Sequence, residues 1–163
     1  MSDYTPPVKE LMFALDKVVG LDGLLCGLET DDIQMILTTA GQLAADVIAP
    51  LNHIGDQVGS KLGADGTVVT PPGFKEAYTQ YREGGWNSVP FNEEFGGQGL
   101  AYPIAFALQE MWQSAGLSFG LCPLLNQAAV EAIDNHGTPE QQAIYLEKLI
   151  SGEWTGTMNL TEP

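Results

Sequence analysis

The sequence predicts a mainly α-helical protein, a bundle of five to six helices followed by one C-terminal β-strand that would start a β-domain missing from this chain. Apolar residues recur at offsets of three and four along most of the chain, which is the period of an amphipathic helix. Prolines, glycines and hydroxyl residues mark the ends of these segments. By contrast, residues 154–161 alternate apolar and polar side chains with the period of two that indicates a strand.

The composition indicates a globular chain of about one domain. Its 163 residues are 44% apolar, which is enough for a packed core of a few helices. The net charge of −15, from 21 acidic and 6 basic residues, argues against nucleic acid, because phosphate contacts need clustered lysine and arginine. An anionic membrane surface is disfavoured for the same reason. A solvated acidic surface is a simpler explanation than a dedicated cationic partner.

Cysteine usage and the chain's first residues bear on the cellular compartment. Cys26 and Cys122 lie far apart without metal-ligand spacing, so we expect two buried thiols and neither a disulfide nor a metal site. Residues 1–7 show no secretory signal. The most apolar segment, residues 117–133, is interrupted by polar side chains, so we expect no membrane span. These features favour a cytoplasmic location.

The first half of the chain is expected to contain a short helix and a long one. Pro6 and Pro7 open the short helix, which ends near Gly20. Thr30 is the expected N-cap of the long helix, which Pro50 should kink or end, with weaker helical character beyond it. Residues 63–70 are expected to form a loop with a turn at Asp65-Gly66.

The second half is expected to add four helices. Pro71-Pro72 opens the first, and a helix over residues 104–115 follows a long connection. Gly116 and Gly120 are expected to bracket a turn before a helix that is apolar around most of its circumference and therefore lies inside the bundle. The last helix begins with a capping box of Thr138 and Gln141 and stops near Gly152.

Two features of residues 90–100 have a chemical and a structural interpretation. The loop Gly96-Gly97-Gln98-Gly99 could cradle a phosphate, but it follows no strand, and a turn between helices is the favoured interpretation. Glu93 and Glu94 could be a general acid and base, but adjacent side chains point apart, so solvated carboxylates are favoured.

The histidines and the polar residues of the apolar helix also favour structural roles. Neither His53 nor His136 has partners that suggest a metal or a nucleophile, and His136 fits a helix C-terminal cap. The polar side chains on the apolar helix are either hydrogen-bond partners inside the bundle, which is favoured, or pocket residues: Asn126, Gln127 and Glu131.

The terminal strand has no predicted partner. A lone strand is not independently stable, so we expect the chain to be a truncated piece whose sheet lies elsewhere. Its apolar face should be frayed, folded back on the bundle or paired with another copy. That face consists of Trp154, Gly156, Met158 and Leu160.

The motifs together resemble the acyl-CoA dehydrogenase family. From His136 the sequence reads H-G-T-P-E-Q-Q-A-I-Y-L-E-K-L-I-S-G-E-W-T-G-T-M-N-L-T-E-P, which is similar to the junction between that family's N-terminal helical domain and its β-domain. Residues 90–100 resemble its P-E-E-(Y/F)-G-G-x-G-(L/M) loop, and residues 30–50 its early helix. The start of the chain resembles an extension in a larger bacterial branch with methylthiopropionyl-CoA dehydrogenase-like members. The implied segments are an N-terminal extension, the helical domain and the first strand of the β-domain: residues 1–29, 30–152 and 153–163.

The resemblance implies an FAD-dependent oxidoreductase of fatty acid metabolism, which converts acyl-CoA to trans-2-enoyl-CoA and passes electrons to an acceptor. The family's catalytic glutamate lies in its C-terminal domain, so no catalytic residue is assigned in this chain. The implied flavin contacts are Met158, Leu160 and Thr161, with Leu160 acting through its backbone because Met158 and Leu160 share the face opposite Thr161. The implied wall for the acyl chain consists of Phe119, Leu121, Cys122 and Leu125.

This resemblance also sets expectations for the chain by itself. It should be inactive and should not retain FAD, and the full-length protein should be a homo-oligomer. Two alternatives are a flavin-dependent acyl-CoA oxidase and a helical interaction module without flavin chemistry.

Overall fold

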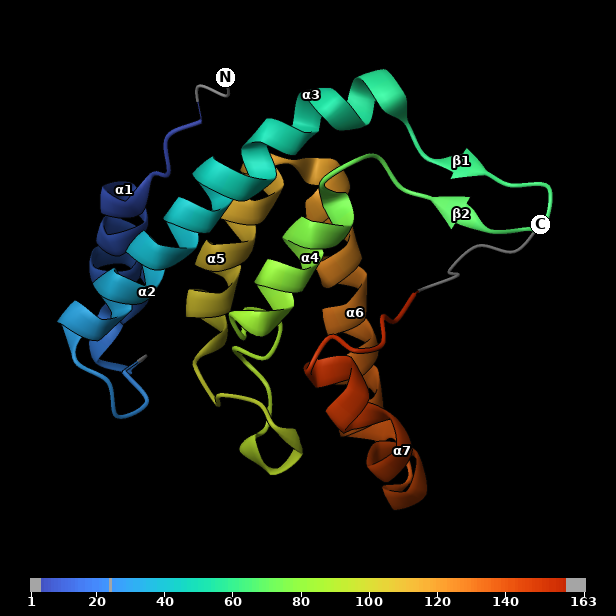
Figure 1. Ribbon diagram of the computed structural model, residues 1–163. Helices are drawn as coiled ribbons and strands as arrows, with labels where there is room; N and C mark the ends of the chain where they lie inside the picture. The colour runs from blue at the N-terminus through green and yellow to red at the C-terminus, as the bar shows by residue number, and fades with distance from the viewer. Residues whose placement is uncertain (1–3, 24, 158–163) are drawn as a thin grey trace.

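The computed structural model describes residues 4–23 and 25–157, and this part of the chain is mainly helical. Figure 1 shows α4, α5 and α6 side by side, with α2 and α3 running across one end of them, α1 against α2, and α7 packed on α6. The predicted fold class is confirmed. The elements are α1 (Val8–Phe13), η1 (Ala14–Gly20), η2 (Leu21–Gly23), α2 (Thr30–Leu43), η3 (Ala44–Ile48), α3 (Ala49–Val58), β1 (Lys61–Leu62), β2 (Val68–Val69), α4 (Phe74–Glu83), η4 (Glu93–Phe95), α5 (Tyr102–Ala115), α6 (Leu117–His136) and α7 (Pro139–Ile150).

The N-terminal segment belongs to the same core as the helices after it. Leu11, Leu15 and Leu21 are buried together with residues of α2 and α5. The chain before α1 also crosses the bundle, because Pro6 lies so close to α2 that a Cβ on Gly41 would come within 2.7 Å of its Cβ. Residues on either side of position 29 therefore share one hydrophobic core.

The long N-terminal helix does not end at Pro50. A π-helical turn, η3, joins α2 to α3, and the Ala49 N–H donates to the Ala44 carbonyl five residues back. Pro50 then lies in the first turn of α3, where its missing N–H leaves no intrahelical bond unmade. Of the two alternatives expected at Pro50, an end of the helix is wrong, whereas the helical stretch expected beyond it is confirmed and continues to Val58.

The N-cap of α2 is Glu29, not Thr30 as predicted. The Glu29 side chain accepts from the backbone of Asp32, and Asp32 Oδ2 accepts from the Glu29 N–H at 2.9 Å. This reciprocal pair satisfies two donors that the helix itself cannot, so the helix begins one residue earlier than the sequence indicated. The capping box predicted for α7 is confirmed, with the Thr138 N–H donating to Gln141 Oε1 at 2.8 Å.

The loop expected over residues 63–70 is the tip of a β-hairpin, with only Val68 and Val69 of it in a strand. Lys61 lies opposite Val69 and Leu62 opposite Val68 in an antiparallel pair. The predicted turn at Asp65-Gly66 is confirmed, because Asp65 Oδ1 accepts from the Thr67 backbone and hydroxyl at 3.1 and 2.7 Å. These bonds hold the pKa of Asp65 below its usual range. Two-residue strands are too short to show a period of two, so the sequence could not indicate them.

Helix α6 begins at Leu117, so the turn predicted over residues 116–120 is wrong. Gly120 lies inside the helix, and its lack of a side chain lets α5 come close. A Cβ there would lie 2.9 Å from Gln113 Cγ. The prediction that α6 is buried on most sides is also wrong, since Leu117 and Leu121 are 54% and 46% exposed.

Aromatic packing joins α4, α5 and α6. The Tyr81 ring is fully buried and meets Trp112 and Phe119 edge-on, with ring centroids 5.7 and 5.8 Å apart. Such edge-to-face pairs add about 1 kcal/mol each beyond the burial of their area. A smaller cluster joins α6, α7 and the loop before η4, and its buried members are Phe91, Val130, Leu146, Leu149 and Ile150.

Replacing Leu15 tests whether the N-terminal segment folds with the bundle. Leu15→Ala should lower the free energy of unfolding by about 3 kcal/mol, because it leaves a cavity in the shared core. Urea denaturation followed by tryptophan fluorescence measures this, since Trp86 and Trp112 lie in the same core. The matched control is Val18→Ala on the exposed side of η1, which should change the free energy of unfolding by less than about 0.5 kcal/mol. An unchanged stability of Leu15→Ala would show that the segment is a separate unit.

Candidate functional site

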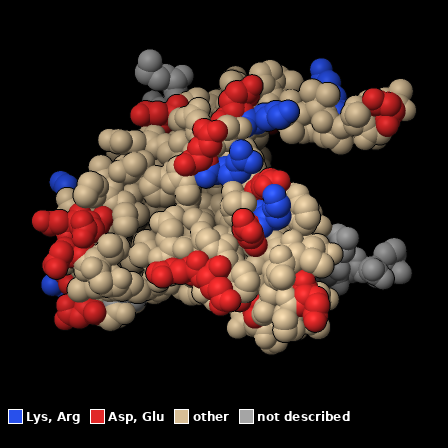
Figure 2. Space-filling view, turned by 60° about the horizontal axis from the view of Figure 1, so that its bottom comes forward, with Lys and Arg blue, Asp and Glu red and all other residues tan. Residues whose placement is uncertain are grey.

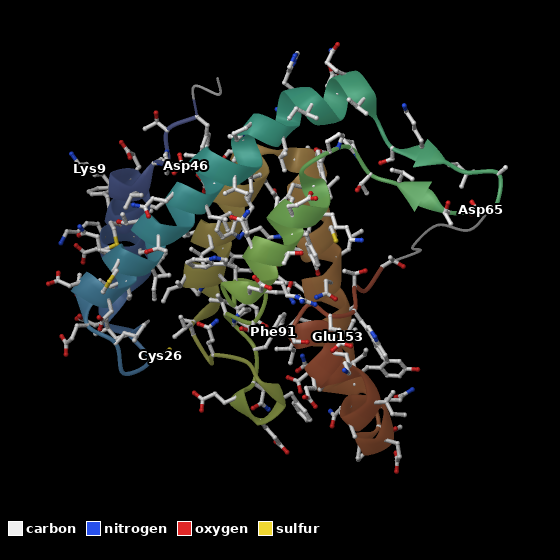
Figure 3. All side chains as sticks on the ribbon, viewed as in Figure 1. Lys9, Cys26, Asp46, Asp65, Phe91 and Glu153 are labelled. Atoms are coloured by element: carbon white, nitrogen blue, oxygen red, sulfur yellow. The ribbon has the colours of Figure 1, made fainter. Side chains whose placement is uncertain are left out.

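The implied flavin contacts Met158, Leu160 and Thr161 lie outside the described residues. The structure does describe the segment that leads to them, residues 151–157. Figure 3 labels Glu153, where the chain leaves α7 and turns towards α6. How this segment is held decides where the following residues begin.

Asn126 fastens this segment to the bundle. Its side chain is fully buried on α6, where Nδ2 donates to the Leu149 carbonyl at 2.8 Å and Oδ1 accepts from the Gly156 N–H at 2.8 Å. Gly156 must lack a side chain here, because a Cβ would lie 2.4 Å from that of Ala129. We call this arrangement the Asn126–Gly156 clasp. For Asn126, the interpretation as a hydrogen-bond partner inside the bundle is confirmed.

Further contacts hold the segment between α7 and the clasp. The Tyr78 hydroxyl donates to the Gly152 carbonyl at 3.0 Å, and Lys148 Nζ lies 2.6 Å from Glu153 Oε2. The Trp154 ring turns back onto α7 and lies 6.2 Å from that of Tyr145. Residues 154–157 therefore form no strand, which corrects the prediction for this part. Of the three alternatives expected for the apolar face, folding back on the bundle is the one that Trp154 shows.

The glycine-rich loop supports the end of α7 and has no free donors for a phosphate. The N–H groups of Gly96, Gly97 and Gly99 donate to the loop's own carbonyls at 2.9 to 3.1 Å. A Cβ on Gly97 would overlap the Phe91 carbonyl (Figure 3 labels Phe91). The structural interpretation is therefore confirmed. Glu93 and Glu94 are exposed, as expected of solvated carboxylates.

Asn87 was not identified from the sequence, yet it anchors the same junction. It is buried, and its Nδ2 donates to the carbonyls of Leu149 and Ile150 at 2.8 and 3.0 Å. The Leu149 carbonyl also accepts from the Gly152 N–H at 3.1 Å, whereas the Ile150 carbonyl, which has no intrahelical partner, is satisfied by Asn87. Nothing in the local pattern around Asn87 distinguishes it from an exposed asparagine.

The four residues implied as the acyl wall do not share one surface. Phe119 and Cys122 line a cleft of about 760 Å³ that is also lined by residues of α3, β2 and α4. Leu121 and Leu125 lie one turn apart on a neighbouring stripe of α6, where Leu121 is exposed and Leu125 is half-buried. The structure thus separates the four residues into two pairs.

Both cysteines are exposed and unpaired, so the expectation of buried thiols is wrong. Cys26 lies before α2 with a φ of +46°, and Cys122 lies on the side of α6 that faces the cleft. Partial burial of the thiol raises the pKa of Cys122. The sequence suggested burial because α6 is apolar, but the cleft lies directly beside this part of the helix.

Other candidate chemistry is absent from the described part of the chain. Residues 4–23 and 25–157 hold no group of three potential metal ligands, and both His53 and His136 are exposed. Over the same residues, no helix combines the length and the apolar character that a membrane crossing requires.

Asn126→Ala should release the clasp. It leaves the Gly156 N–H without its partner, whereas the Leu149 carbonyl keeps its bond from Asn87, so we expect a loss of about 2 kcal/mol in unfolding free energy. Amide hydrogen exchange at Gly156 should accelerate by at least tenfold relative to amides in the middle of α5. Gln127→Ala is the control on the adjacent position. Unchanged protection of the Gly156 amide would contradict the clasp.

Two tyrosines near the cleft should make stability depend on alkaline pH. Burial raises the pKa of Tyr78 from 10.0 to about 12, and burial raises that of Tyr81 further. Their stabilising contribution is complete below pH 10 and is lost as pH rises towards 12, because the unfolded chain releases these protons first. Urea unfolding should give a lower free energy of unfolding at pH 11 than at pH 9. Tyr78→Phe should make this difference between the two pH values smaller. If Tyr78→Phe lost as much unfolding free energy between pH 9 and pH 11 as the unchanged protein, the assignment to Tyr78 would be contradicted.

Comparison with known proteins agrees with the geometry. Residues 30–153 match the family model for the acyl-CoA dehydrogenase N-terminal domain. The chain is 42% identical to 3-methylmercaptopropionyl-CoA dehydrogenase of Ruegeria pomeroyi, over 98% of this chain and 28% of that protein. It is 30% identical to a butyryl-CoA dehydrogenase of Syntrophomonas wolfei, over 100% of this chain and 27% of that protein.

A solved structure has a similar fold. A chain from a structure of the electron transferring flavoprotein of Acidaminococcus fermentans superimposes with a TM-score of 0.67 at 26% identity, covering 83% of this chain and 33% of that one. The present chain spans about 28% of the length of the Ruegeria pomeroyi relative. From the family match and these relatives, the chain belongs to the acyl-CoA dehydrogenase family and corresponds to its N-terminal domain.

Proposed function

We propose that this chain is the N-terminal helical part of an FAD-dependent acyl-CoA dehydrogenase, which removes hydrogens from the α and β carbons of an acyl-CoA thioester. The observation that supports this most directly is the Asn126–Gly156 clasp. It fixes the start of the segment that the family resemblance assigns to the flavin. The activity would belong to a longer polypeptide, because the Ruegeria pomeroyi relative is more than three times the length of this chain.

In this proposal the residues after the clasp contact the flavin. Met158 and Thr161 would do so through their side chains and Leu160 through its backbone. When bound, FAD would accept the hydride from the β carbon, and the Thr161 hydroxyl would donate to the pyrimidine side of its ring system, where negative charge develops. The described residues fit this role, since Thr155 and Thr157 are exposed on a segment whose Gly156 is held against α6.

The acyl chain would lie against Leu121 and Leu125. Leu121 presents apolar surface that no described residue covers, and Leu125 lies one turn further along the same stripe. Phe119 is unsuitable, because it is 5% exposed and its ring packs against Tyr81. Cys122 faces the cleft instead. No residue of this chain is assigned as the base that takes the α-proton.

Several further features of the parent protein belong to the same proposal. It would act in the cytoplasm as a homo-oligomer and pass electrons to an external acceptor. An acyl-CoA oxidase is the alternative enzyme, and consumption of oxygen with formation of peroxide would distinguish it. A non-catalytic helical module is the alternative of another class.

The complete product of the gene that encodes this chain tests the proposal. We expect it to purify with a flavin absorption spectrum and to reduce an artificial electron acceptor when an acyl-CoA is added. Thr161→Val should slow flavin reduction by about tenfold, because it removes one donor to the developing charge. Thr155→Val, on the exposed lead-in, is the matched control. A complete product that stays colourless after reconstitution with FAD would refute the enzyme function. The 163-residue chain alone should show no flavin after gel filtration.

A further inference from the structure

We propose that the cleft between α3, the β1–β2 hairpin, α4 and α6 is a separate ligand site, and that it binds a small aromatic monocarboxylate. The cleft has a volume of about 760 Å³, within the range of small-molecule sites in proteins. This inference does not depend on the proposed dehydrogenase function.

Aromatic side chains form the apolar part of the cleft. Phe74 and Tyr78 come from α4 and Phe119 from α6. Helix α3 lies very close to this surface at Gly55, where a Cβ would be 2.9 Å from Phe74 Cζ. Phe119 is 5% exposed and lies beneath this surface, so the half-buried rings of Phe74 and Tyr78 are the ones that favour a flat aromatic ligand, because offset or edge-on ring contacts add to the burial of apolar area.

Unpaired polar groups surround this aromatic surface. The Lys75 ammonium forms no ion pair within residues 4–23 and 25–157. The hydroxyls of Ser60, Thr70 and Ser118 also line the cleft, and within the same residues none has a hydrogen-bond partner. One cation with nearby hydroxyl donors is suited to a carboxylate, since charge-assisted hydrogen bonds are the strongest that such groups make.

The surrounding charge limits the ligand to a single negative charge. Asp56 lines the same cleft as Lys75, and the protein has a net charge of −15. Figure 2 shows acidic side chains spread over this face of the molecule, with fewer basic ones scattered among them. A ligand with several phosphates would meet both Asp56 and this overall negative field, so it is disfavoured.

This cleft differs from the stripe proposed for the acyl chain. Ser118 and Cys122 are four residues apart and face the cleft, whereas Leu121 and Leu125 form the adjacent stripe of α6. These four positions recur at offsets of three and four, so the two surfaces are neighbours on α6, and of the four residues only Ser118 and Cys122 line the cleft.

The two exposed cysteines provide an internal test. Cys122 lines the cleft and Cys26 lies outside it. We expect millimolar 2-naphthoate to slow iodoacetamide alkylation of Cys122 in the 163-residue chain and to leave Cys26 unchanged, as measured by peptide mass spectrometry. Equal concentrations of 2-naphthol and octanoate should protect Cys122 less.

Lys75→Gln tests recognition of the carboxylate. Loss of one charge-assisted bond should raise the concentration of 2-naphthoate needed for half-protection by about tenfold. Lys9→Gln on α1 is the matched control, because it removes the same charge far from the cleft along the chain. Circular dichroism checks that both variants keep the fold.

Three outcomes would overturn the proposal. The first is alkylation of Cys122 that 2-naphthoate does not slow. The second is protection that is the same in Lys75→Gln, or that 2-naphthol gives equally well, since either shows that no anion is recognised. The third is stronger protection by octanoate, which would show a preference for alkyl chains over aromatic rings.

Discussion

The backbone carbonyl of Leu149, near the C-terminal end of α7, is the point on which the arrangement of the candidate site depends. It accepts hydrogen bonds from two buried side chains, Asn87 in the loop after α4 and Asn126 on α6. A helix cannot satisfy its own last carbonyls, and this carbonyl also accepts from the Gly152 N–H at 3.1 Å in the turn after α7. The two asparagine bonds tie three segments to this one atom.

The same network sets the direction of the chain after α7. Asn126 uses its remaining oxygen to hold the Gly156 N–H, and Gly156 packs on Ala129 because it has no side chain. The described segment is therefore held on α6 as far as Gly156. A polar side chain on a mainly apolar helix is thus explained by the segment it holds and needs no catalytic role.

Helix α6 serves three purposes on different sides. Phe119 and Val130 pack into the core, Cys122 faces the cleft, and Leu121 presents apolar surface outward. A sequence pattern that is apolar on most sides suggests a helix at the centre of a bundle. In this structure the apolar residues of α6 instead face the core, the cleft and the open surface. The two proposed ligand surfaces lie next to one another because both are on this helix.

The sequence by itself determined the helices, their approximate ends, the capping box of α7 and the family, because each depends on residues close together in the chain or on whole motifs. Only the tertiary structure decided the bonding of Asn87 and Asn126, the exposure of Cys122 and the separation of Phe119 from Leu121. These properties depend on segments distant in sequence, such as Gly156 against Asn126, 30 residues apart. A helical period shows that a residue lies on a face, but the element packed against that face determines its environment.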